Sequence, residues 1–164
     1  MKKNTILLLA GVCTLMTGCG GTKYSQENTL DKQGVKATVK DVLTLKTESF
    51  KWVQETTMGI EDSPLGSFES YVKFVYSGAA EQTDVENTYK LTVEKLVVSG
   101  YKCEGDAANV GNLGMETSFS LMFDEATVDA IMDGKKVIIE NAAEVFAPTY
   151  VVVNPEEKTF TGVL

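Results

Sequence analysis

The feature that most constrains this fold is an alternation of apolar and polar side chains, which begins at Val35 and returns in several later segments. Such a period of two is typical of a strand with one buried face. In residues 35–46 the apolar face is formed by Val35, Ala37, Val39, Leu43 and Leu45. Asp41 falls on this apolar face, so the sequence predicts a bulge or a twist there.

Similar patterns predict a series of further short strands, at residues 68–76, 89–98, 117–123, 137–139, 145–146, 150–153 and 159–164. A short helix is predicted over residues 125–133, with Asp124 as its N-cap and Gly134 at its C-terminal end. Glycine and asparagine predict a loop over residues 104–114. These elements indicate a mainly β fold, either an antiparallel β-sandwich or a partly open barrel with one short helix. An α+β fold with the helix packed on a sheet is the alternative.

The first 18 residues have the organisation of a secretory signal peptide. Lys2 and Lys3 precede an apolar run over residues 6–16, and small residues lead to Cys19. The apolar run is about half as long as the ~20 residues that a membrane-spanning helix needs. We therefore expect a removable targeting segment and no permanent transmembrane helix.

The quartet Met16-Thr17-Gly18-Cys19 resembles the lipobox of bacterial lipoproteins, with Met16 in place of the more usual leucine. This resemblance implies export, cleavage before Cys19 and lipidation of Cys19. More than one acyl chain on Cys19 would hold the protein stably at a membrane. The expected location is the cell membrane or the outer membrane, facing the periplasm or the cell surface.

The polar composition of residues 19–34 predicts a flexible stalk, followed by a single globular domain over residues 35–164. The outline of that domain loosely resembles the immunoglobulin-like domains found behind lipoboxes in many small surface lipoproteins. After cleavage, Cys103 would have no cysteine partner except the acylated Cys19, so no internal disulfide is expected. We expect Cys103 to act as a small apolar side chain.

Composition narrows the possible functions. The 164-residue chain contains neither histidine nor arginine and has a formal net charge of −8. Without histidine there is no Ser-His or Cys-His nucleophile pair and no imidazole metal ligand. Without arginine there is no planar fork for phosphate, and the negative charge disfavours nucleic acid as a partner. We expect no metal, no cofactor and no catalytic residue.

The aromatic side chains provide the candidate ligand-binding residues, Trp52 and Tyr71. Both flank residues 55–67, which read as a long loop, and long loops on a β scaffold often carry binding sites. The alternative is that Trp52 belongs to the core. The leading hypothesis is a non-catalytic binding or accessory domain that contacts an envelope protein, a peptide or a glycan.

Two alternative functions remain open at this point. A glycan-active enzyme could use a pair of carboxylates, which would have to face one another across a groove. A structural envelope component could self-assemble through an exposed edge strand.

Overall fold

A computed structural model describes residues 20–61 and 64–164, so the predicted signal peptide and the lipidation at Cys19 lie outside the described residues. The described part is mainly β, as predicted. Its strands are β1 (Thr22–Lys32), β2 (Val35–Leu45), β3 (Ser49–Ile60), β4 (Phe68–Gln82), β5 (Thr88–Glu104), β6 (Val137–Glu140), β7 (Thr149–Asn154) and β8 (Thr159–Thr161). Its helices are α2 (Ala108–Ser120), α3 (Glu125–Met132) and the short 3₁₀ helix η1 (Ala142–Glu144).

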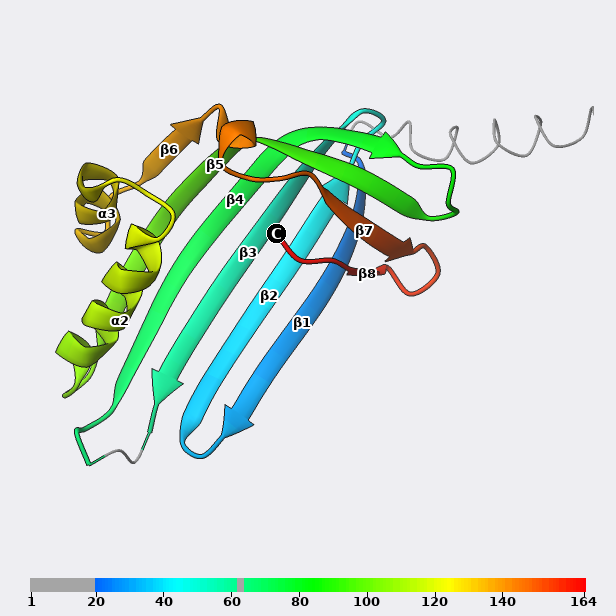
Figure 1. Cartoon of the computed structure of the whole chain (residues 1–164). Coiled ribbons are helices and arrows are strands. Elements are labelled where there is room, and N and C mark those ends of the chain that lie inside the picture. The colour runs from blue at the N-terminus through cyan, green and yellow to red at the C-terminus, as the bar shows by residue number, and fades with distance from the viewer. Residues whose placement is uncertain (1–19, 62–63) are drawn as a thin grey trace, which may run out of the picture.

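Seven of the strands form a closed barrel (Figure 1). Strands β1 to β5 are consecutive antiparallel neighbours, β7 pairs with the start of β5, and β8 pairs with β7. The ring is closed by a parallel contact between β8 and β1, at Ser25 and Thr159. Strand β6 pairs with β5 outside the ring. A β-sandwich, one of the two predicted arrangements, is not confirmed.

The core fills the half of the barrel that β7 and β8 cover and continues beneath helices α2 and α3. Because side chains alternate across each strand, one row of inward positions crosses five adjacent strands. This row consists of Tyr24, Leu43, Trp52, Tyr76 and Leu96, all of them buried. Phe160 of β8 closes over it, with its ring 5.0 Å from that of Trp52 in an edge-to-face arrangement. The apolar side chains that predicted the strands therefore meet in one interior.

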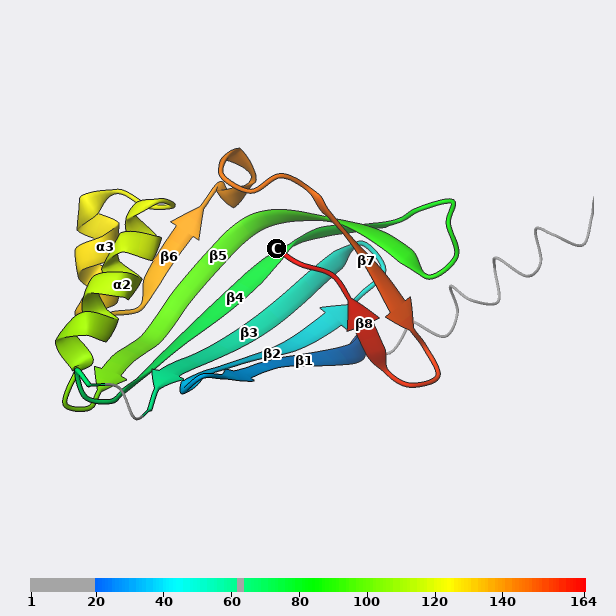
Figure 2. The same ribbon diagram turned by 60° about the horizontal axis from the view of Figure 1, so that its bottom comes forward.

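Helix α2 lies against the inner face of β4 and β5, at the end of the barrel away from the start of β1 (Figure 2). Phe119 packs on Phe74 and Tyr101, with ring centroids 6.4 and 5.9 Å apart. Gly111 allows the helix to approach the sheet closely, because a Cβ there would meet Cys103 Sγ and Phe68 Cδ2 at 2.7 Å each. Helix α2 thus covers one side of the sheet's inner surface.

The helix predicted after Asp124 is present as α3. The Asp124 carboxylate accepts a hydrogen bond from the Thr127 N–H at 2.9 Å, as an N-cap does. Val128 and Ile131 are buried and face the core, while Gly134 follows the helix with a positive φ of 72°. Spacing and capping residues therefore predicted this element correctly.

The segment predicted as a flexible stalk is instead mostly strand β1. Every residue from Thr22 to Lys32 pairs with β2 in continuous register. The connecting turn, Gln33-Gly34, has φ angles of 55° and 79°, which is the two-residue geometry that suits a hairpin. Pairing with the amphipathic β2 stabilises a strand whose own side chains are mostly polar. The folded domain consequently begins before residue 35.

Four other expectations need correction. Residues 55–60 of the predicted loop 55–67 are strand, since β3 continues to Ile60 along β4, whereas residue 61 and residues 64–67 lie outside any strand. The predicted loop 104–114 and strand 117–123 are mainly helix α2, and residues 145–146 follow η1 outside any strand. In each case contacts with neighbouring elements override the local composition.

Candidate binding site

The barrel is closed along only part of its length. Strand β8 pairs with β1 only at Ser25, and in the described chain the remainder of β1 pairs with β2 on one side and with no strand on the other. Helix α2 covers the inner face of β4 and β5, but it leaves the corresponding parts of β1, β2 and β3 uncovered. We call this uncovered inner surface the open trough; α2, the free edge of β1 and residues 162–164 border it (Figure 2).

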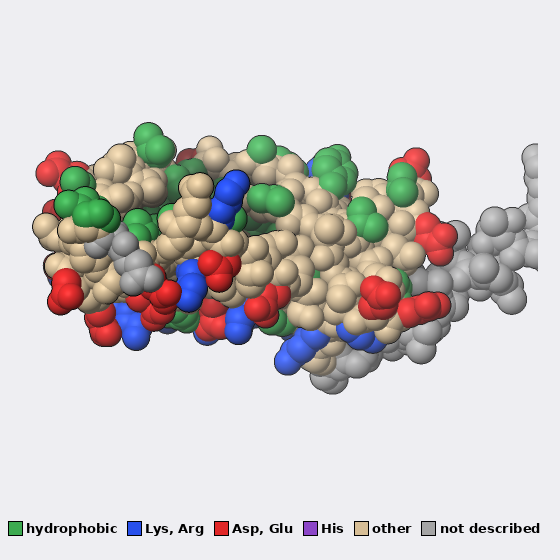
Figure 3. All heavy atoms as spheres, turned by 90° about the horizontal axis from the view of Figure 1, so that it is seen from below, with side chains coloured by type: hydrophobic (Ala, Val, Ile, Leu, Met, Phe, Trp, Pro, Cys, Tyr) green, Lys and Arg blue, Asp and Glu red, His purple; other side chains and the backbone are tan. Residues whose placement is uncertain are grey.

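Apolar side chains dominate the walls of the open trough. Their inward direction follows from the register, in which they continue the rows of the core. Leu30 is 52% exposed and the others are half-buried, whereas equivalent positions in the closed half are fully buried. The apolar wall residues are Leu30, Val35, Ala37, Val39, Met58 and Ile60. A space-filling view from below shows apolar side chains within a hollow of the surface (Figure 3).

The floor of the open trough is a polar cluster centred on Asp41. Asp41 Oδ1 accepts hydrogen bonds from Trp52 Nε1 at 2.7 Å and from Gln54 Nε2 at 3.0 Å. Asp41 Oδ2 accepts one from Gln26 Nε2 at 3.0 Å. The carboxyl group is only 2% exposed, whereas both glutamines are half-buried. The predicted bulge is wrong, because Asp41 stays in regular register and its partners satisfy it.

This cluster gives the floor an excess of hydrogen-bond acceptors. Gln26 Nε2 also donates to the Gly162 carbonyl at 3.0 Å, so both amide protons of Gln26 are engaged. The carbonyl oxygens of Gln26 and Gln54 then remain as acceptors beside the carboxyl group, against one remaining N–H of Gln54. Burial, together with the negative charge of Asp41, raises the pKa of Tyr76 in the adjoining core row. The floor therefore suits ligand groups that donate hydrogen bonds or carry positive charge.

Trp52, one of the two predicted ligand-binding residues, has no exposed surface. Its ring packs in the core and its N–H is used by Asp41. Trp52 is therefore a core residue, as the alternative expectation stated, and it is not available as a ligand anchor. It contributes to the site only by fixing the Asp41 side chain.

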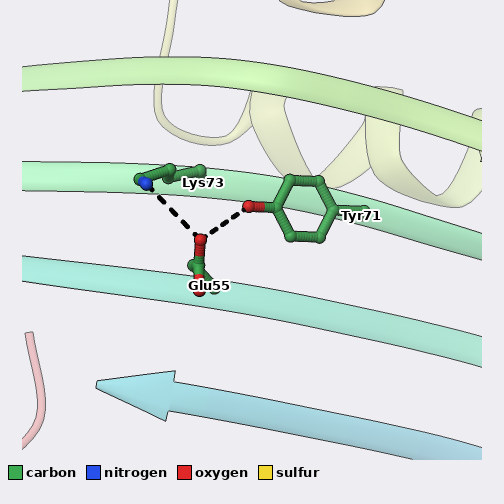
Figure 4. A network of polar contacts seen from close by, with 3 residues as sticks. All are labelled: Glu55, Tyr71 and Lys73. Atoms are coloured by element: carbon green, nitrogen blue, oxygen red, sulfur yellow. Dashed lines mark hydrogen bonds and ion pairs between the residues drawn. The ribbon is translucent and has the colours of Figure 1, made fainter. Parts of the chain in front are cut away.

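Tyr71, the other predicted residue, lies on the opposite face of the sheet from the open trough. Its hydroxyl group donates to Glu55 Oε1 at 2.9 Å, and Lys73 Nζ lies 3.4 Å from the same oxygen (Figure 4). The Tyr71 hydrogen bond is the largest cause of a lowered pKa at Glu55, with Lys73 adding to it. Burial and then Glu55 raise the pKa of Tyr71. These three residues form a surface polar network that joins β3 to β4.

A second hollow lies on the outer face of the sheet, near the β3–β4 connection. Its volume is about 510 Å³, and Gly59 contributes no side chain to fill it. Lys36 and Glu61 border it and form an exposed ion pair at 2.8 Å. Exposed pairs of this kind hold a surface together only weakly, and the hollow lacks the buried acceptors of the open trough.

Cys103 is half-buried beside α2, with its Sγ 3.5 Å from the Ala108 carbonyl. Burial raises the pKa of the thiol, although a hydrogen bond with Tyr101 lowers it. A thiol held in its neutral form is a poor nucleophile. The geometry therefore agrees with a packing role for Cys103.

Sequence reasoning did not identify Gln26, Asp41, Gln54 or Met58 as site residues. One signal was present, since Asp41 interrupts an otherwise regular apolar face. Gln26 lay in the expected stalk and Met58 in the expected loop, so neither could be assigned to an inner surface.

No protein-family model, no curated protein and no solved structure matches this chain. Within residues 20–61 and 64–164, no helix has both the length and the apolar character needed to cross a membrane.

Proposed function

We propose that this protein is an exported lipoprotein, anchored through Cys19, whose barrel binds a partner in the envelope without catalysing a reaction. The anchoring part of the proposal rests on the lipobox-like quartet that ends at Cys19. The binding part rests on the open trough. Its half-exposed apolar walls around a few fixed polar groups are the composition expected of a ligand site.

The open trough favours binding over hydrolysis by a carboxylate pair. Glycan hydrolysis of that type needs two carboxyl groups about 5 to 10 Å apart beneath a groove. The inner faces of β1 to β5 provide one, Asp41, and three side-chain donors occupy it. A lone acceptor cluster orients a ligand but supplies no acid and base pair.

Anchoring is tested by growing cells with a clickable palmitate analogue and comparing the full chain with Cys19→Ala. The expected result is label on the unsubstituted protein and none on Cys19→Ala, with the labelled protein in the detergent phase. Cys103→Ala serves as the control and should keep the label. Label that persists in Cys19→Ala would overturn lipidation at this position.

Binding is tested by crosslinking in intact cells and mass spectrometry of captured envelope components, using two full-length variants. Met58→Glu places a charge in the open trough, while Thr57→Glu places the same charge on the outer face of the same strand. We expect a captured component to be lost with Met58→Glu and kept with Thr57→Glu. Equal capture by both variants would exclude the open trough as the binding surface.

A further inference from the structure

Among residues 20–61 and 64–164, most of one edge of strand β1 pairs with no other strand. Its residues from Gln26 to Lys32 pair with β2 in unbroken register, yet β8 reaches only Ser25. Proteins protect such an edge with proline, a bulge, charged side chains or a covering element, and of these β1 has the charged side chains Glu27, Asp31 and Lys32. The segment contains no proline, and its pairing with β2 shows no bulge.

One hydrogen bond determines which backbone groups the edge presents. The Ser25 N–H donates to the Lys158 carbonyl at 2.9 Å, so Ser25 directs its backbone groups away from β2. Successive residues of a strand direct these groups to opposite sides. The N–H and C=O groups of Glu27, Thr29 and Asp31 therefore point outward along the free edge.

From these observations we propose that an extended segment of a partner protein adds to β1 as a further strand. The proposal rests on the binding function above and names its partner class. A strand added beside β1 would turn alternate side chains into the open trough, next to Leu30. Backbone hydrogen bonds would supply affinity, and the trough would select apolar side chains at those alternate positions.

The charged side chains of β1 indicate which residues the outer face of the added strand should carry. Glu27 and Asp31 are exposed and lie on the outer face of β1, each opposite a lysine of β2, Lys40 or Lys36, with Glu27 Oε2 3.9 Å from Lys40 Nζ. The chain as a whole carries a net charge of −8. Lysine or arginine at the outward positions of the partner would lie beside these carboxylates, and opposite charges on neighbouring strands attract. The partner segment is therefore an alternating apolar and basic strand.

A second copy of this chain fits the edge less well. The antiparallel arrangement that uses the whole free edge is centred on Thr29 and places Glu27 of one copy opposite Asp31 of the other. Like charges directly opposite each other destabilise a strand pair. Self-assembly is therefore an outcome that the test must separate from partner binding.

The test uses the full chain in detergent micelles and a synthetic peptide of alternating valine and lysine. Amide hydrogen exchange is followed by NMR with and without the peptide. We expect the peptide to slow exchange at Glu27, Thr29 and Asp31, while Asn28 and Leu30, already directed at β2, change little. A peptide with glutamate in place of lysine should bind at least tenfold more weakly.

Two variants test the edge directly. Thr29→Pro removes an outward N–H that β2 does not use, and edge strands tolerate proline; peptide affinity should fall at least tenfold. Thr29→Ala keeps the N–H and should bind normally. As a check that does not depend on proline, Asp31→Lys should weaken binding of the lysine peptide and strengthen binding of the glutamate peptide.

The outcomes separate this inference from the proposed function. Peptide binding that Met58→Glu abolishes, without protection at the alternate β1 amides, would overturn strand addition and leave trough binding intact. Protection that grows with protein concentration in the absence of peptide would show pairing between copies and overturn the partner proposal. No peptide binding, together with equal capture by Met58→Glu and Thr57→Glu, would overturn both.

Discussion

The indole N–H of Trp52 donates to Asp41 Oδ1 over 2.7 Å, joining the core of the barrel to the floor of the open trough. The two residues lie on adjacent strands, β3 and β2, and neither is appreciably exposed. This hydrogen bond holds the Asp41 carboxyl group in position to face Gln26 and Gln54.

Replacing Trp52 by phenylalanine would remove the donor and leave Asp41 with fewer partners in a buried setting. The expected loss is about 1–3 kcal/mol in the free energy of unfolding, the usual cost of an unsatisfied buried polar group, with some further loss of packing. Urea denaturation followed by circular dichroism measures it. Tyr150→Phe, at an exposed position, is the control and should unfold like the unsubstituted protein. Equal stability of Trp52→Phe would contradict the role given to this hydrogen bond.

Tyr71→Phe should raise the pKa of Glu55 toward its ordinary value, because the Tyr71 hydroxyl group is the largest cause of its lowering. A carboxylate with a lowered pKa in the folded state adds stability above the unfolded-state pKa, and this stability is lost as the pH falls through the folded-state pKa. The stability advantage over Tyr71→Phe should therefore shrink below about pH 4.5. NMR titration of the Glu55 side chain and denaturation at several pH values check this; an unchanged titration would contradict it.

Helix α2 contains two glycines with opposite surroundings. A methyl group at Gly114 would meet no atom within 4 Å, whereas one at Gly111 would meet Cys103 and Phe68 at 2.7 Å. Because alanine has a higher helix propensity than glycine, Gly114→Ala should stabilise the protein by about 0.5–1 kcal/mol. Gly111→Ala should destabilise it, since the helix must shift from the sheet. Thermal denaturation of Gly114→Ala and Gly111→Ala measures both effects. Stabilisation by both substitutions would show that α2 is not packed closely on the sheet.

The N-cap of α3 offers a local test. Asp124→Ala removes the acceptor of the Thr127 N–H and should cost about 1 kcal/mol in the free energy of unfolding. Asp124→Ser restores a capping oxygen and should recover most of that loss. Chemical denaturation of the two variants provides the comparison; equal losses would indicate that charge, and not the cap, matters at this position.

The sequence allowed correct prediction of strands where burial leaves a regular pattern. Strands β2, β4, β5 and β7 contain alternating or continuous apolar side chains, and all were expected. Strand β1 was not, because only Tyr24 of its side chains is buried and its stability comes from β2. The turn at Gln33-Gly34 lacks the asparagine or aspartate that usually marks such hairpins.

Helix α2 and the open trough were not predicted from the sequence, for a different reason. Gly111 and Gly114 suggested a loop, but Gly111 serves the close contact between helix and sheet. Phe119 reads as part of an alternating strand, although it anchors a helix face on Phe74. Which residues line the inner surface depends on which strands pair to close the barrel. No single segment of the sequence specifies that pairing.

The position of β1 has a consequence for how the proposed lipoprotein would meet its partners. Thr22 already belongs to the strand, so three peptide units separate the barrel from Cys19, a reach of roughly 10 Å. If Cys19 is lipidated as proposed, a domain on so short a tether would reach little of the surrounding space and would move as its lipids diffuse in the plane of the membrane. Encounter would therefore be two-dimensional, which favours partners confined to the same bilayer surface over molecules that diffuse freely past it.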